Sequence, residues 1–347
     1  MRATAVVVPR ERFTSLPGSL RSLFRTIPAD VPVVVVEGAS PAATRAELAV
    51  LLRERPFELV SFPYMVKPNE ARNIGVSMAE TEYVVIADND VEYEPGWFEE
   101  FRRHALEYGS DAVAALTCVG PPPATIIHQA GGVLEAVRTE EGIALFDRHR
   151  LAEVPLADAT LPGMEHHVCE LHCLLVRRSL LEELGGLDER LVSREQVDLA
   201  LRLLVLEARV TFAKDAVVTY MARDVFDPVD LRYLLFRWSD RFVVESLDAF
   251  ESTWGVSLDR DDIRYAWAAE HRLRGVETTY PRLRRILGKE RFRRFVVRRL
   301  EQKVLSEQLR ARAAIVPAVP KPLACERVKR ALEDLVEATG RGALTAR

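Results

Sequence analysis

Two aspartates separated by one residue follow an apolar run, and these side chains are suited to holding a divalent cation. The run at 83–87, Tyr-Val-Val-Ile-Ala, lacks polar alternation, which is typical of a strand buried on both faces of a parallel sheet. Asp88 and Asp90 follow at the carboxyl edge, where such sheets bind ligands, and in an extended segment both point to one side. Carboxylates suit Mg2+ or Mn2+, which also bind phosphate oxygens. A polar turn is the alternative interpretation.

A second apolar run also ends in an acid. Residues 33–36 are four valines, and Glu37 follows them. Because parallel strands present their carboxyl ends at one edge of a sheet, we expect Glu37 beside Asp88 and Asp90. The small residues at 38–40 would let a flat ring or a ribose approach the backbone. Neither G-x-G-x-x-G nor G-x-x-x-x-G-K-S/T occurs, which argues against a dinucleotide oxidoreductase and a P-loop NTPase.

The elements that must position these acids alternate between strand and helix. The predicted strands are 4–8, 31–36, 57–62 and the run before Asp88. The predicted helices are 16–25, 42–53, 70–79 and 96–108. This alternation indicates an α/β fold with a doubly wound, mostly parallel sheet.

Composition narrows the class of protein. The chain has 347 residues, 48% of them apolar, which fits a globular protein with one large core or one large and one small core. No apolar run is long enough to cross a bilayer and no signal-peptide pattern occurs, so we expect a cytoplasmic protein. Four cysteines do not make a disulfide framework at this size, and reduced thiols are expected.

The chain changes character after about residue 222. We predict one domain at 1–222 and a helical C-terminal extension at 223–347. Residues 259–312 contain sixteen Lys or Arg against eight Asp or Glu. Such a basic helical region is either a solvated helix face or a surface for peripheral contact with an anionic membrane. No aromatic stacking platform or groove motif points to nucleic acid.

The segment 165–173, Glu-His-His-Val-Cys-Glu-Leu-His-Cys, is rich in possible metal ligands. A zinc site normally pairs such a cluster with a second one, and no second cluster is evident in the sequence. Alternation on a strand explains the segment better, with Cys169 and Cys173 on one face and Glu170 and His172 on the other. On this interpretation Glu170 and His172 lie on the polar face of the strand, where they would line a cleft.

Six short segments occur in a characteristic order over residues 3–250. They are VVVP at 6–9, VVEGAS at 35–40, NEARNIG at 69–75, DND at 88–90 with PGW at 95–97, GGLDE at 185–189 and REQVDLALR at 194–202. Together they resemble the family 2 glycosyltransferases with the GT-A fold, and the set is far more specific than any one motif. The resemblance implies transfer of a hexose-type unit from a nucleotide sugar to an acceptor hydroxyl, with inversion at the anomeric carbon.

The resemblance also implies roles for individual residues. Asp90, with Asp88, would hold Mn2+ or Mg2+ on the diphosphate of the donor, where the cation offsets the charge of the departing group. Glu37 would contact the nucleoside, and Arg72 would line the nucleotide pocket. Alternatively, Arg72 is a helix-surface arginine that pairs with a glutamate. A UDP sugar is the first expectation for the donor and a GDP sugar the second. The acceptor is not indicated.

Two positions differ from the pattern of the family. The general base usually comes from a Glu-Asp pair before a helix, and here the pair is Glu195-Gln196. Glutamine cannot accept the proton, so Glu195 is the first candidate for the base and Asp198 the second. Asp198 has a structural alternative, stabilisation of a helix N-terminus. The strand at 216–221 also lacks the histidine that contacts the metal in family members. Either carboxylates, phosphates and water alone would hold the ion, or the ion would bind weakly.

Two other functions remain open from the sequence. A sugar nucleotidyltransferase also uses carboxylate-bound metal, but it normally has a basic, glycine-containing loop that residues 9–12 only partly supply. A non-catalytic glycosyltransferase-like binding domain is favoured by Gln196, by Glu37 in place of the commoner aspartate, and by the missing histidine.

Overall fold

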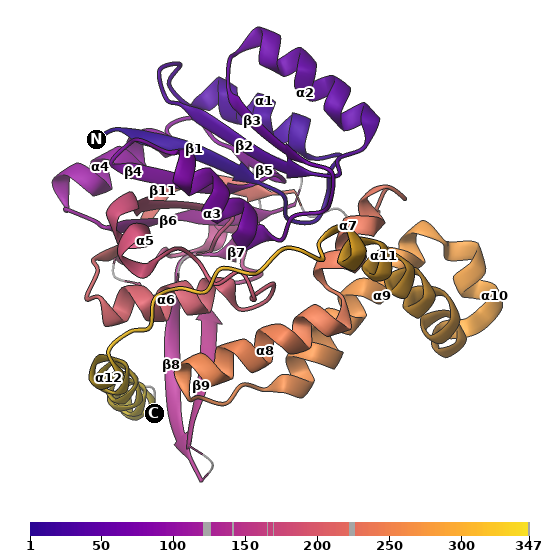
Figure 1. Cartoon of the computed structure of the whole chain (residues 1–347). Helices are drawn as coiled ribbons and strands as arrows, with labels where there is room; N and C mark the ends of the chain where they lie inside the picture. Colours follow the sequence, from indigo (N-terminus) through magenta and orange to yellow (C-terminus); the bar gives the residue numbers. More distant parts are fainter. Residues whose placement is uncertain (121–125, 141, 165, 169, 222–225, 346–347) are drawn as a thin grey trace.

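The structure is a computed structural model that describes residues 1–120, 126–140, 142–164, 166–168, 170–221 and 226–345, with side chains to residue 340. In these ranges, nine strands form one sheet with helices on both faces (Figure 1). The order across the sheet is β3 (Glu58–Phe62), β2 (Val33–Gly38), β1 (Ala3–Val8), β4 (Tyr83–Asp88), β10 (Cys173–Arg177), β6 (Ala112–Val119), β11 (Val210–Tyr220) and β5 (Val91–Tyr93), and β7 (Ile126–Gln129) pairs with β6.

Alternate residues of the central strands pack against different helices. Ala5 and Val7 of β1 lie in one core, whereas Val6 and Val8 lie in another. The first core includes α1 (Leu16–Thr26), α2 (Ala42–Glu54) and α4 (Trp97–Glu107), and the second includes α3 (Pro68–Met78), α5 (Arg178–Leu184) and α6 (Glu195–Val205). Because both faces are covered, the strands need no polar alternation. The predicted α/β fold with a doubly wound, mostly parallel sheet is confirmed.

The direction of β10 brings a second segment to the edge where β4 ends. β10 runs antiparallel to β4, and Cys173 pairs with Ala87, so the residues before β10 lie beside Asp88. The Asp88 amide donates to the carbonyl oxygen of His172 at 3.0 Å. The expectation of a strand through 170–172 is wrong, because these residues form a loop and a turn before the pairing begins. Cys169 lies outside the described residues.

Helix α3 approaches β1 closely through a glycine. A Cβ on Gly75 would lie 2.2 Å from Cγ1 of Val6, so only glycine fits without a shift of the strand or the helix. The other side of α3 is fixed by Asn73, whose amide Nδ2 donates to the carbonyl of Leu187 at 2.9 Å. These two contacts hold α3 in place, and α3 carries Arg72 to the end of β4.

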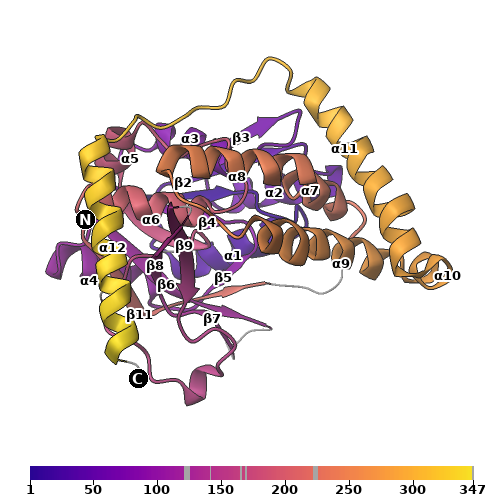
Figure 2. The ribbon, with the colours of Figure 1, turned by 90° about the horizontal axis from the view of Figure 1, so that it is seen from below.

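Helices form most of the chain after residue 226. They are α7 (Asp230–Arg237), α8 (Asp240–Trp254), η2 (Asp262–Ala269), α9 (Glu270–Thr279), α10 (Pro281–Phe292), η3 (Arg293–Val297), α11 (Arg298–Ala311) and α12 (Cys325–Thr345). Helix α12 lies beside the hairpin of β8 (Gly132–Thr139) and β9 (Gly142–His149), on the opposite side of the molecule from α10 and α11 (Figure 2). In the part of the chain described, no helix combines the length and the apolar character needed to cross a membrane.

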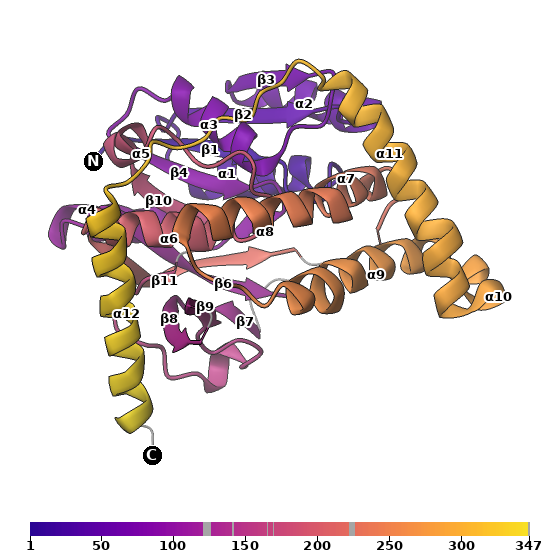
Figure 3. The same cartoon turned by 60° about the horizontal axis from the view of Figure 1, so that its bottom comes forward.

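The C-terminal helices pack directly on the α/β part. Tyr233 of α7 donates to the carbonyl of Val66 at 2.6 Å, and Gln308 of α11 accepts from the amide of Met65 at 2.8 Å. Residues of α6 and α8 share one apolar cluster, and Figure 3 shows both helices. We keep the division into 1–222 and 223–347 as a proposal, since its boundary falls at residues outside the described ranges.

Candidate active site

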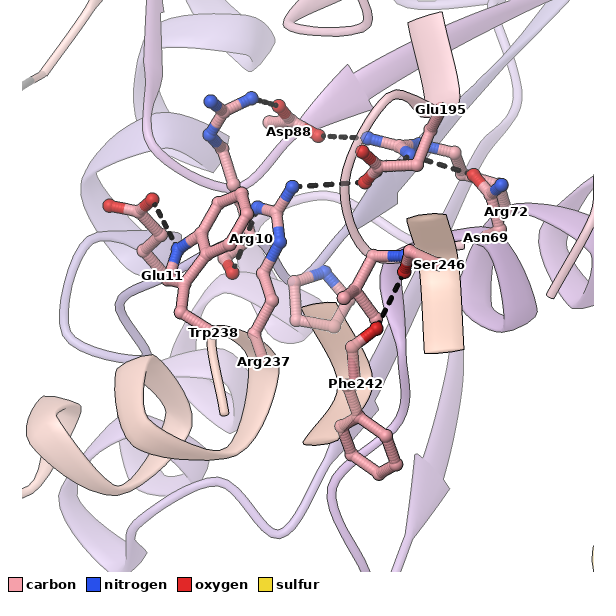
Figure 4. Close-up of polar contacts among 12 residues, drawn as sticks. Arg10, Glu11, Asn69, Arg72, Asp88, Glu195, Arg237, Trp238, Phe242 and Ser246 are labelled. Atoms are coloured by element: carbon pink, nitrogen blue, oxygen red, sulfur yellow. Dashed lines mark hydrogen bonds and ion pairs between the residues drawn. The ribbon is translucent and has the colours of Figure 1, made fainter. Parts of the chain in front are cut away.

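Asp88, the last residue of β4, is held by two arginines. Arg10 Nη1 donates to Asp88 Oδ2 and Arg72 Nη2 donates to Asp88 Oδ1, each at 2.9 Å, and Figure 4 shows the carboxylate between the two guanidinium groups. Burial alone would raise the pKa of Asp88, but the two positive charges outweigh it and hold this pKa well below its ordinary value. The three groups together carry one net positive charge, which suits a site for phosphate.

Asp90 lies next to this cluster with no donor of its own. The residue is 0% exposed, and neither oxygen of its carboxylate accepts a hydrogen bond from any described residue. Burial is the main reason that its pKa rises to about 7, and the nearby charge of Asp88 adds to the shift. A bare buried carboxylate is costly, and a bound cation would remove that cost. The residues present therefore fit the divalent cation that the sequence suggests.

His172 completes a possible set of metal ligands, although it does not come from the strand at 216–221 that supplies a histidine in family members. Ligand atoms of Asp88, Asp90 and His172 all lie within 4.8 Å of one another. His172 Nδ1 is 3.3 Å from Asp88 Oδ2, and the imidazole ring packs on Tyr220 with ring centroids 4.4 Å apart. Met221 follows the strand that lacks a histidine, and its amide donates to the carbonyl oxygen of Asp90 at 2.8 Å. The structure thus revises the expectation that carboxylates, phosphates and water alone would hold the ion.

Glu195 begins helix α6 and is tied to the arginine cluster. Its Oε1 accepts from Arg237 Nη2 at 3.0 Å and lies 3.9 Å from Arg72 Nη1 (Figure 4). Among the described residues, no donor reaches its Oε2. Arg72 is buried and links Asp88 to Glu195, so it is not the surface arginine of the alternative interpretation. Two sequence candidates that are far apart along the chain therefore meet through one guanidinium group.

Asp198 and Glu37 are occupied by local contacts. Asp198 Oδ2 accepts from Arg202 Nε at 2.8 Å, and its Oδ1 accepts from Trp254 Nε1 at 2.9 Å. The contact with Arg202 lies within α6, and the contact with Trp254 joins α6 to α8. Glu37 is the residue before the last of β2, and its Oε2 accepts from the amide of Ser40 at 3.1 Å. The expectation that Glu37 lies beside Asp88 and Asp90 is wrong, because β1 lies between β2 and β4 in the sheet.

A cleft of about 230 Å³ lies beside these residues. Its walls come from both halves of the chain. They are formed by Arg10, Arg72, His128, Asp147, His149, Glu170, Leu171, Ser193, Arg194, Glu195, Gln196, Arg237, Trp238, Asp262 and Trp267. Glu170 lies in this lining as the sequence predicts, whereas Asp88, Asp90 and His172 are fully buried beside Arg10.

Sequence reasoning missed several residues of the site. Arg10 follows β1 in the loop at 9–12, and the residue types of this loop indicate only part of a nucleotidyltransferase motif. Trp238 donates from Nε1 to Glu11 Oε1 at 3.0 Å, and the arginine-tryptophan pair at 237–238 was the one signal that could point to it. His128 and His149 lie on β7 and β9 and belong to no motif, so no pattern in the sequence indicates them.

Comparisons with known proteins identify the fold and the family. A crystal structure of GalNAc-T7 with UDP, GalNAc and Mn2+ matches with a TM-score of 0.52 and 13% identity, over 82% of this chain and 54% of that chain. Residues 4–185, just over half of the chain, match the family described as Glycosyl transferase family 2. The class that the fold and the site define is thus a GT-A protein with carboxylates at the end of a central strand. The chain belongs to glycosyl transferase family 2.

Curated relatives fall in the same class. The pre-mycofactocin glycosyltransferase of Mycobacterium tuberculosis, from strains CDC 1551 and H37Rv, is 25% identical over 166 residues. That match covers 47% of this chain and 32% of the relative, so the chain spans about a third of the length of the curated relatives it matches. Family membership favours a glycosyltransferase over the sugar nucleotidyltransferase that the sequence left open.

The buried Asp90 predicts a pH dependence of stability in the metal-free protein. The pKa of Asp90 in the folded state, about 7, is above its ordinary value. The folded state is therefore stabilised when Asp90 is protonated at low pH, and this stabilisation is lost as the pH rises through 7. Between pH 6 and pH 8 in EDTA, the free energy of unfolding of the wild type should fall by about 1 kcal/mol more than that of Asp90→Asn. Urea unfolding at both pH values measures it.

Asp158→Asn is the matched control, because Asp158 is exposed. Its variant should show the same pH dependence as the wild type. Equal slopes for the wild type and Asp90→Asn would contradict the description of Asp90 as a buried carboxylate without a donor.

Proposed function

We propose that this protein transfers a sugar from a nucleotide-sugar donor to an acceptor hydroxyl with the help of a divalent cation. The observation that carries the proposal is the fully buried Asp90, whose carboxylate has no donor among the described residues, at the end of a central GT-A strand. Asp90 and His172 would hold the cation beside Asp88. Mn2+ or Mg2+ suits these oxygen and imidazole ligands, and when bound it would offset charge on the donor diphosphate.

Two arginines support the same leaving group. Arg10 and Arg72 both line the cleft and both donate to Asp88, so their charges are fixed before a ligand arrives. Charges fixed in advance stabilise a developing phosphate anion without reorganisation during the reaction. The solved neighbour was crystallised with UDP and Mn2+, which makes UDP sugars the first donors to test and GDP sugars the second.

Glu195 is the proposed general base. The acceptor oxygen would attack the anomeric carbon while the bond from that carbon to the diphosphate oxygen breaks, and the hydroxyl proton would pass to Glu195 Oε2. Arg237 holds the other oxygen at 3.0 Å and so orients the carboxylate. Attack from the face opposite the leaving group inverts the anomeric carbon. Gln196 lines the same cleft and can bind a hydroxyl without accepting its proton.

The basic helices suggest where an acceptor on a membrane would be met. On α10 and η3, Ile286 is 78% exposed and Phe295 is 50% exposed, and several arginines of the same two elements are also exposed. These arginines are Arg282, Arg285, Arg291, Arg293 and Arg294. Exposed apolar side chains among cations are typical of a surface that binds anionic lipid. We propose peripheral membrane contact through α10 and η3.

Donor binding should depend on both metal and Asp90. With UDP, GDP, CDP and dTDP sugars screened in Mn2+ or EDTA, one nucleotide should raise the melting temperature of the wild type only in Mn2+. Asp90→Ala should lose this rise and the release of nucleoside diphosphate, while Asp158→Ala should keep both. Release of pyrophosphate, or stabilisation that is equal in EDTA, would contradict the proposal.

The two base candidates should separate by kinetics. Glu195→Gln should lower kcat by about 100-fold or more, with donor-induced stabilisation unchanged, because only proton transfer is removed. Asp198→Asn should lower the melting temperature through its contacts with Arg202 and Trp254 and leave kcat within about tenfold. A large loss of kcat in Asp198→Asn, with full activity in Glu195→Gln, would reverse the assignment.

Membrane contact should require the charge of α10 and η3. In flotation with phosphatidylglycerol vesicles, Arg282→Glu, Arg285→Glu and Arg294→Glu combined should lower the partition coefficient by about 100-fold or more, because each arginine near the surface contributes about 1 kcal/mol and the three together about 3 kcal/mol. The control is the triple substitution to Glu at Arg25, Arg53 and Arg102, which are exposed elsewhere on the protein. This variant should bind the vesicles as the wild type does. Equal binding to neutral phosphatidylcholine vesicles would argue against this contact.

A further inference from the structure

A second group of possible metal ligands lies in the cleft, separate from the Asp90 site. His128 of β7, His149 of β9 and Glu170 before β10 each offer a ligand atom, and these three atoms lie within 4.8 Å of one another. His149 Nε2 and Glu170 Oε1 are 3.5 Å apart. Three separate elements of the fold thus bring two imidazoles and one carboxylate together at a single point.

The surroundings leave these ligands available. In the described structure, Glu170 has no hydrogen-bond donor, and the imidazole of His149 is its one ion-pair partner. His128 makes ring contacts with His149, His172 and Tyr220, and no described residue hydrogen-bonds either of its ring nitrogens. A nearly buried carboxylate and an imidazole without hydrogen bonds are a costly combination in the absence of a ligand.

The position of the group allows an ion to enter and to keep open coordination positions. All three residues are partly exposed and line the cleft of about 230 Å³. Asp147 adds a second carboxylate, with Oδ2 3.7 Å from His149 Nε2, and Arg194 Nη1 holds its Oδ1 at 2.6 Å. Three protein ligands with open positions toward a cleft differ from a closed structural zinc site, which normally has four.

We propose that His128, His149 and Glu170 form a second cation site, for a divalent transition metal such as Zn2+, Co2+ or Mn2+. Two imidazoles and one carboxylate select these ions over Mg2+ and Ca2+, which prefer oxygen ligands alone. The site shares no ligand with the group of Asp88, Asp90 and His172, although the rings of His128 and His172 have centroids only 5.5 Å apart. It goes beyond the proposed function, because either site can exist without the other.

Cobalt titration tests the second site without any assay of activity. The full chain without a histidine tag is titrated with Co2+, with the visible absorption bands and the bound equivalents from dialysis as readouts. The wild type should bind two equivalents. His149→Ala and Glu170→Gln should each weaken the binding of one equivalent by about 100-fold or more and change the absorption bands. Each removes a direct ligand, and even the loss of an outer-shell partner costs about 10- to 100-fold in affinity. Asp90→Asn should lose the other equivalent.

His167→Ala is the matched control, since His167 is also partly exposed but lines a different cavity. It should keep both equivalents. Far-ultraviolet circular dichroism confirms the fold of each variant, and two independent variants protect against a single one that fails to fold. One equivalent in the wild type that is lost in Asp90→Asn would overturn the second site and leave the proposed function intact. If His149→Ala and Glu170→Gln each still bind two equivalents of Co2+ with unchanged affinity, the proposal of a second site would also be overturned.

Discussion

The burial of two carboxylates at the end of β4 is the constraint on which the rest of the site depends. Two anions so close together need positive charge, and the fold supplies Arg10 from the loop after β1 and Arg72 from α3 to one of them. Asp90 receives no such partner from the described residues. This asymmetry leaves one carboxylate structurally satisfied and the other ready for a cation, because a buried charge must be paired or be neutralised.

The C-terminal helices are part of the site. Arg237 and Trp238 at the end of α7 reach Glu195 and Glu11, which lie in the α/β part of the chain. Each of these contacts pairs a buried acid with a donor from the other part, so removal of the helices would expose or unpair the acids. The contacts that join the two parts of the chain therefore also form one side of the cleft. For this reason residues from both parts line it.

The fold could be predicted further from the sequence than the site could. The strands at β1, β2 and β4 follow from unbroken apolar runs, and such runs report burial on both faces directly. Glu170 was predicted for the cleft by alternation on a strand, yet it reaches the cleft from a loop before β10. The ligands that accompany it, His128 and His149, come from a different part of the sheet and from a hairpin, so a search for a second cluster along the sequence could not find them.

The sequence by itself determined the strand that ends in Asp88 and Asp90, because strand formation and the change from apolar to charged residues are local properties. Only the tertiary structure decided which side chains meet them. Arg10 reaches Asp88 across 78 residues, and His172 arrives because β10 runs antiparallel to β4. Pairing across the sheet depends on strand direction and register, which no short segment of the chain encodes alone. The partner of each buried charge is therefore a property of the whole fold.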